Sequence, residues 1–150
     1  MKKKITAIVQ VRIGSSRLKA KALKKIKGKE NIILLLERLS QTKKIDNIIV
    51  AIPDTNENDV LDNLLKKYNY NIFRGSEKNV LKRYYDCAKK FKILNILRIT
   101  GDCPLVDPKL VDKLASKYQL GNYDYLSNIE DRSFPDGMDI EIFSFKTLHK

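Results

Sequence analysis

Apolar residues along this chain alternate between short continuous runs and patterns in which they recur three and four positions apart. Continuous apolar runs are typical of strands buried on both faces of a sheet, whereas the wider spacing is typical of helices with one buried face. The runs predicted to be strands are 5–11, 47–52, 71–74, 95–100, 123–127 and 138–143. The segments predicted to be helices are 31–42, 56–68, 76–91 and 107–118, with a further helix starting at Phe145.

Strands that are separated by helices favour a mostly parallel sheet with helices on both faces, which is a three-layer α/β/α sandwich. In such sheets ligands bind outside the carboxyl ends of the strands. Two polar segments are expected at that edge, because residues 10–21 extend from the end of the first predicted strand and residues 101–102 follow the strand at 95–100. We therefore expect the chemistry of the chain where these two segments meet.

The segment after the first strand has the composition of a phosphate-binding loop. Its glycine allows the backbone to approach a phosphate closely, its serines add hydroxyl donors, and its arginines and lysine add positive charge. The spacing matches neither the P-loop nor the dinucleotide-binding fingerprint, and a plain solvated loop is the alternative. The residues expected to contact nucleotide phosphates are Arg12, Gly14, Ser15, Ser16, Arg17 and Lys21.

A carboxylate lies at the end of the strand predicted at 95–100. Asp102 follows Gly101 and precedes a turn that Pro104 restricts. Opposite a triphosphate loop, its natural role is to hold Mg²⁺, which prefers carboxylate, water and phosphate oxygens. The alternative is that Asp102 only caps the turn. Asp107 is better explained as the N-cap of the next helix, with Pro108 at the first helical position, and is not predicted to be a ligand.

The composition narrows the class of protein. The formal net charge of +12 suggests a nucleic-acid partner, but the lysines are scattered along every predicted helix and no nucleic-acid-binding motif is present. No apolar run is long enough to span a bilayer, so no membrane partner is expected. Cys87 and Cys103 are too few for a disulfide framework or a zinc site, which favours a cytoplasmic protein with reduced thiols. A chain of 150 residues is enough for one domain.

Four separated motifs together resemble the sugar-activating cytidylyltransferases, which include the synthetases of CMP-acylneuraminate and CMP-deoxyoctulosonate. The likeness is greatest to the spore-coat-polysaccharide (SpsF-type) branch. The motifs are Q-x-R-x-G-S-S-R-L-x-x-K at 10–21, F-R-G-S at 73–76 followed by V-L-x-R-Y-Y at 80–85, R-I-T-G-D-C-P-L at 98–105, and F-P-D-G-M-D-I-E-I-F at 134–143. The resemblance implies a nucleotide-diphosphosugar-transferase-like fold. It also implies transfer of CMP from CTP to an acid sugar or sugar phosphate in surface-polysaccharide synthesis, with release of pyrophosphate.

The resemblance also implies roles for single residues. Lys21 and Arg17 would be catalytic, together with Asp102, which would bind the catalytic Mg²⁺. The residues implied to hold the CTP phosphates are Arg12, Ser15, Arg17 and Lys21. Those implied to approach the base and ribose are Arg83 and Thr100, and those implied to face the sugar are Asp136, Asp139 and Glu141. Each of these three acidic residues also has an alternative explanation without a ligand. Asp136 with Gly137 can be an ordinary turn pair, and Asp139 and Glu141 can lie on one solvated face of a strand.

The chain departs from the family pattern in two ways. Lys19 and Ala20 stand where the family usually has Pro-Gly, so the loop should be less pre-set. Family chains are longer and carry a later Asp that completes the metal site, so we expect a single nucleotidyltransferase domain that lacks its C-terminal part.

A homodimer is compatible with the family pattern. The alternatives are a metal-dependent glycosyltransferase on a similar fold and a truncated, non-catalytic nucleotide-binding module.

Overall fold

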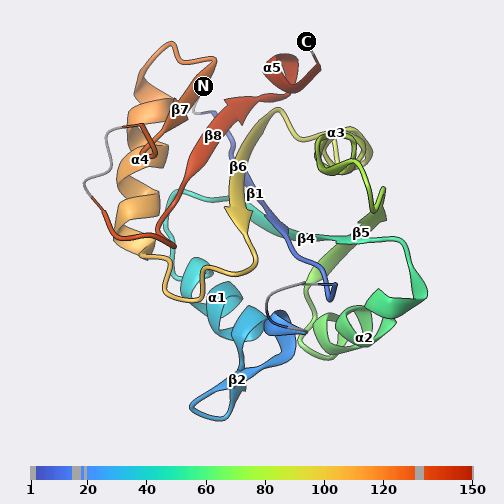
Figure 1. The fold of residues 1–150 in the computed structure, drawn as a ribbon. Helices are drawn as coiled ribbons and strands as arrows, with labels where there is room; N and C mark the ends of the chain where they lie inside the picture. Colours follow the sequence, from blue (N-terminus) through green and yellow to red (C-terminus); the bar gives the residue numbers. More distant parts are fainter. Residues whose placement is uncertain (1–2, 15–17, 19, 131–133, 150) are drawn as a thin grey trace.

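The computed structural model describes residues 3–14, 18, 20–130 and 134–149, and Ser15, Ser16 and Arg17 therefore lie outside the described residues. Its centre is a six-stranded sheet with the strand order β5-β4-β1-β6-β8-β7 (Figure 1). The strands of this sheet are β1 (Thr6–Gln10), β4 (Asn47–Pro53), β5 (Asn71–Gly75), β6 (Asn95–Thr100), β7 (Tyr125–Ser127) and β8 (Glu141–Ser144). The helices are α1 (Asn31–Leu39), α2 (Asp59–Lys67), α3 (Val80–Lys90), α4 (Pro108–Leu120) and α5 (Phe145–His149).

The sheet is mostly parallel, as predicted. β1 pairs in parallel with both β4 and β6, and β4 pairs in parallel with β5. Only β8 runs antiparallel to its neighbours β6 and β7 among the described strands of this sheet. A short hairpin of β2 (Lys25–Ile26) and β3 (Lys29–Glu30), which the pattern did not predict, precedes α1.

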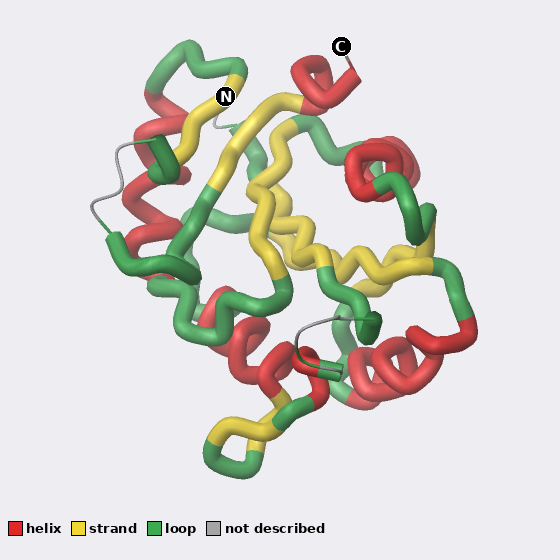
Figure 2. The backbone as a smooth tube through the Cα atoms, in the orientation of Figure 1, coloured by secondary structure: helices red, strands yellow, loops and turns green. Residues whose placement is uncertain are grey.

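Helices cover both faces of the sheet, so the predicted α/β/α sandwich is confirmed (Figure 2). Alternate strand residues point to opposite faces. On one face Ala7 and Val9 of β1 join a core with α1, α2 and α4, and on the other Ile8 joins Tyr84 of α3 and Phe145 of α5. Ala7, Ile8 and Val9 are all completely buried, which explains why β1 reads as a continuous apolar run. No helix in the described part of the chain is both long and apolar enough to cross a membrane.

Two predicted boundaries differ from the structure because side chains take over backbone hydrogen bonds. The predicted strand at 138–143 begins only at Glu141, since the amide of Asn128 bonds to Ile140 N (2.8 Å) and Met138 O (2.9 Å) in place of a strand neighbour. The predicted helix at 76–91 begins at Val80, because Asn79 caps it by accepting from Lys82 N at 2.8 Å.

The carboxyl ends of β1 and β6 are held unusually close together. Gly101 N donates a hydrogen bond to Gln10 O at 2.7 Å. A Cβ on Gly101 would lie only 2.5 Å from Val11 Cβ, so this approach requires a glycine. The contact brings the loop after β1 beside the turn that carries Asp102.

Candidate functional site

The loop after β1 is anchored through Ile13. Its N–H donates to Asn58 Oδ1 at 3.0 Å, and its carbonyl accepts from Ala20 N at 3.3 Å. Ala20 has φ +51°, in the left-handed region that favours glycine, which gives a physical reason for the glycine that the family usually carries here. Gly14 lies exposed beside Glu57, whose Oε2 would be 3.4 Å from a Cβ at that position.

Lys21 and Asp102 meet across the edge of the sheet, as the sequence predicts. Lys21 Nζ lies 3.4 Å from Asp102 Oδ2, and the two side chains are 40% and 51% exposed. Burial acts to raise the pKa of Asp102, but hydrogen bonding to Thr100 and the charge of Lys21 outweigh it and lower the pKa below its ordinary value of 3.8. Asp102 is therefore an ionised, accessible carboxylate at neutral pH.

Thr100 and Cys103 complete the turn around Asp102. Thr100 Oγ1 lies 3.0 Å from Cys103 Sγ, and Cys103 Sγ donates to Asp102 Oδ1 at 3.7 Å. Burial raises the pKa of Cys103, and the charge of Asp139 contributes to this, so Asp139 also lies close to the site. Cys103 is thus a protonated packing residue and not a nucleophile.

The residues around Asp102 fit one kind of metal site. Within the described residues, no three His, Cys, Asp or Glu side chains gather closely enough to form a metal cage. Mg²⁺ does not need one, because it is commonly held by one or two carboxylates with water and substrate phosphates filling the other positions. A single exposed carboxylate beside a basic loop suits that mode of binding.

Arg83 is a fully buried cation with incomplete hydrogen bonding. Its Nη1 donates to Ser76 O at 2.5 Å, while Nε and Nη2 have no partner within the described part of the chain. Burial lowers the pKa of Arg83, and the charge of the exposed Arg12 acts in the same direction. The two predicted nucleotide-binding arginines are therefore close enough for the charge of one to affect the other.

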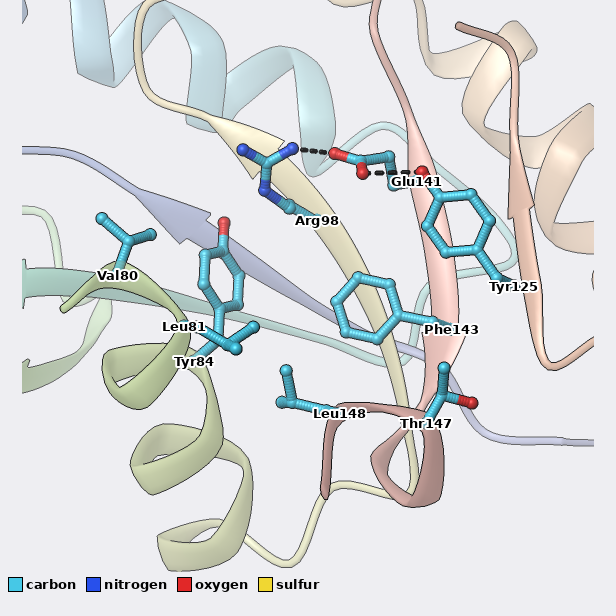
Figure 3. Close-up of a pocket in the computed structure, with 9 residues that line it drawn as sticks. All are labelled: Val80, Leu81, Tyr84, Arg98, Tyr125, Glu141, Phe143, Thr147 and Leu148. Atoms are coloured by element: carbon cyan, nitrogen blue, oxygen red, sulfur yellow. Dashed lines mark hydrogen bonds and ion pairs between the residues drawn. The ribbon is translucent and has the colours of Figure 1, made fainter. Parts of the chain in front are cut away.

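Glu141 lies in a separate pocket of about 590 Å³ on the face of the sheet that α3 and α5 cover (Figure 3). Its carboxylate pairs with Arg98 Nη1 and accepts from Tyr125 Oη at 2.7 Å. The other walls are apolar and include Val80 and Phe143. Glu141 is only 15% exposed, so the alternative of a solvated strand face is wrong for this residue.

The remaining acidic candidates lie before β8. Asp136 is exposed and precedes Gly137, whose φ of +89° marks a turn. The charge of Asp139 acts on Cys103, the neighbour of Asp102. Sequence reasoning assigned no role to Arg98, although a charged residue inside an otherwise apolar strand was a signal. It also missed Asn58, which lies in a polar segment without any distinguishing pattern.

A family model described as cytidylyltransferase matches residues 6–136. The chain belongs to the cytidylyltransferase family. This confirms the resemblance drawn from the four sequence motifs and the fold class that it implied.

Individual cytidylyltransferase relatives support the assignment. The chain is 41% identical over 147 residues to an uncharacterized protein of Methanocaldococcus jannaschii, covering 98% of this chain and 59% of that one. It is 35% identical over 130 residues to the spore coat polysaccharide biosynthesis protein SpsF of Bacillus subtilis, covering 83% and 54%. A solved cytidylyltransferase from Leptospira borgpetersenii superposes with a TM-score of 0.91 at 36% identity, covering 97% and 62%. The chain thus spans little more than half the length of the curated relatives.

Proposed function

We propose that this cytidylyltransferase-family chain binds CTP and transfers CMP to a sugar, with release of pyrophosphate, in the synthesis of a surface glycan. The observation that carries the proposal is the meeting of Lys21 with Asp102 at 3.4 Å, at the edge of a parallel sheet where ligands bind. The name of the 35%-identical SpsF supports a role in polysaccharide synthesis.

In the proposed reaction an acceptor oxygen attacks the α-phosphorus of CTP in line. A new oxygen–phosphorus bond forms, the bond from the α-phosphorus to the bridging oxygen breaks, and pyrophosphate leaves with the bonding electrons. No protein side chain needs to form a covalent bond, so catalysis depends on positioning and on stabilising charge.

Different residues of the chain are proposed to position the substrates and to stabilise charge. Arg12 and Lys21 would hold the phosphates, and Arg17, which lies outside the described residues, is proposed to help them. Asp102 would hold Mg²⁺, which when bound would neutralise part of the phosphate charge. Thr100 and Arg83 remain the proposed contacts to the ribose and base.

The pocket around Glu141 is the proposed place for the sugar. Arg98 on β6 lies two residues before Thr100 and faces the same side of the sheet, so the pocket lies on the face to which Thr100 points. The Glu141 carboxylate is held in place by Arg98 and Tyr125 and can accept a hydrogen bond from a sugar hydroxyl. Asp139 and Asp136 are proposed to approach the same substrate from the preceding turn.

The test is a thermal-shift panel with CTP, UTP, ATP and GTP, each with and without Mg²⁺, followed by a pyrophosphate-release assay with candidate sugars. A ligand at about a hundredfold excess over its dissociation constant should stabilise the fold by about 2.7 kcal/mol. Mg²⁺-dependent stabilisation that is greatest with CTP, followed by pyrophosphate release, supports the proposal. Binding without release with any sugar would favour a non-catalytic module, and absence of any response would contradict nucleotide binding.

A further inference from the structure

Ile13 anchors the loop that carries Gly14 and Lys21 to the rest of the fold. Ile13 is 8% exposed, its N–H donates to Asn58 Oδ1, and its carbonyl accepts from the N–H of Ala20. The loop therefore leaves from Ile13 and returns to it just before Lys21. Any movement of Ile13 is transmitted to both ends of the loop.

Asn58 itself cannot move freely. It is 1% exposed and lies on the short helix η2 (Asn56–Asn58) between β4 and α2. Its Nδ2 donates to Thr55 Oγ1 at 2.8 Å, and its backbone N–H donates to Thr55 O at 3.0 Å. These bonds fix the direction of the side-chain amide, so that Oδ1 faces Ile13.

Arg74 at the end of β5 holds the segment on both sides of Asn58. Its Nε donates to Asp54 Oδ1 at 2.9 Å, its Nη1 to Asp59 Oδ1 at 2.7 Å, and its Nη2 to Thr55 O at 3.0 Å. Hydrogen bonds to Asp59 and Asp54 raise the pKa of Arg74, so it stays charged. The position of the loop after β1 is thus determined from β5, two strands away.

We infer that Asn58 is a positioning residue for nucleotide binding: its amide, held by Thr55 on a segment that Arg74 fixes, sets where Gly14 and Lys21 lie relative to Asp102. The inference rests on the proposed function, since it assumes that this loop contacts the CTP phosphates. A buried N–H without a partner is costly, so loss of the amide displaces Ile13 or admits water. Shifts of about 1 Å in a binding constellation are enough to weaken it strongly.

The experiment compares two side chains that perform the same local task at opposite ends of β1. Asn58 accepts from Ile13 N after the carboxyl end, and Asp46 Oδ2 accepts from Ile5 N at 2.8 Å before the amino end. CTP affinity with Mg²⁺ is measured by isothermal titration calorimetry for the unchanged chain, Asn58→Ala and Asp46→Ala, well below their melting temperatures. Amide hydrogen exchange at Ile13 is followed by NMR in parallel.

We expect both variants to melt earlier, but only Asn58→Ala to lose about tenfold or more in CTP affinity and to exchange rapidly at Ile13. Equal affinity in Asn58→Ala and the unchanged chain would overturn the inference while leaving the proposed function intact, and so would equal losses in both variants. If the unchanged chain binds no nucleotide, the proposed function and the inference fail together. Should Asn58→Ala not fold, Thr55→Val releases the Asn58 amide and must weaken CTP binding in the same direction.

Discussion

Replacement of Arg83 by methionine should make the ligand-free protein more stable. Arg83 is completely buried, and within the described part of the chain Nε and Nη2 have no partner while Nη1 donates one bond to Ser76 O. A buried donor without a partner costs about 1–3 kcal/mol, so two cost roughly 2–6 kcal/mol, whereas a hydrogen bond from a charged group contributes only about 1.5–3 kcal/mol. Methionine fills a similar length with no polar group. The expected net gain in the free energy of unfolding is about 1–3 kcal/mol.

Urea unfolding without nucleotide measures this gain, and each kcal/mol corresponds to about 2–4 °C in melting temperature for a chain of this size. The same Arg83→Met variant should bind CTP more weakly, because Arg83 is a proposed contact to the nucleotide and two of its nitrogens have no partner among the described residues. Arg38→Met is the matched control. Arg38 Nε already donates to Val106 O at 2.9 Å, so its loss should lower stability by about 1 kcal/mol and leave CTP binding unchanged.

The reasoning is refuted if Arg83→Met loses more than about 1 kcal/mol of stability and binds CTP as before. Arg83 would then be a brace for the turn at Ser76, and its unpartnered nitrogens would have no bearing on the ligand. A gain in stability with unchanged CTP affinity would confirm the cost of burial but remove Arg83 from the nucleotide site.

Four further experiments test the site and its surroundings. Asp102→Asn should change the free energy of unfolding by less than about 1 kcal/mol, because the pair of Asp102 with Lys21 is half exposed. The same variant should abolish the Mg²⁺-dependent thermal shift with CTP. The control is Asp86→Asn, which removes a 2.7 Å surface pair with Lys82 on α3 and should keep that shift. Since the pKa of Asp102 is lowered, its carboxylate stays charged as the pH falls towards 3.8, and the Mg²⁺ response should persist at about pH 5. Gly101→Ala places a Cβ 2.9 Å from a backbone oxygen and should cost about 1–3 kcal/mol in urea unfolding. Burial raises the pKa of Cys87 to about 12, so its thiol should not react with iodoacetamide at about pH 8 until the chain unfolds. Peptide mapping measures the alkylation of Cys87, and rapid labelling of the native protein would contradict this expectation.

The fold class could be predicted because its determinants are local. Three consecutive residues of β1 are fully buried, and such burial on both faces leaves a continuous apolar run in the sequence. The place of the site followed from topology alone, since parallel strands end at one edge. The start of β8 could not be predicted, because the amide of Asn128 competes for backbone groups ten or more positions away. The spacing of apolar residues along the sequence gives no information about such a contact.

The same limit applies to charged residues whose partners depend on strand register. Arg98 and Glu141 are direct cross-strand neighbours of β6 and β8, which are separated by more than forty positions in the chain. The motifs at 98–105 and 134–143 each contain a charged residue in apolar surroundings, but the sequence does not indicate that these two residues form an ion pair. Asn58 is a similar case, because its role depends on a single bond to Ile13 across 45 positions.

The polar groups at the edge of the sheet differ in how well the protein itself satisfies them, and this difference indicates what a ligand must supply. Asn58 and Arg74 have protein partners in well-defined geometry, so they hold the loop in place. Two nitrogens of Arg83 have no partner among the described residues, and Lys21 and Asp102 share a 3.4 Å, half-exposed contact that a ligand can replace at little cost. The described groups left incomplete include two cations and one carboxylate, and an anionic ligand that also brings a divalent cation would suit them. A magnesium nucleoside triphosphate has both properties, whereas a neutral sugar or a free nucleoside has neither.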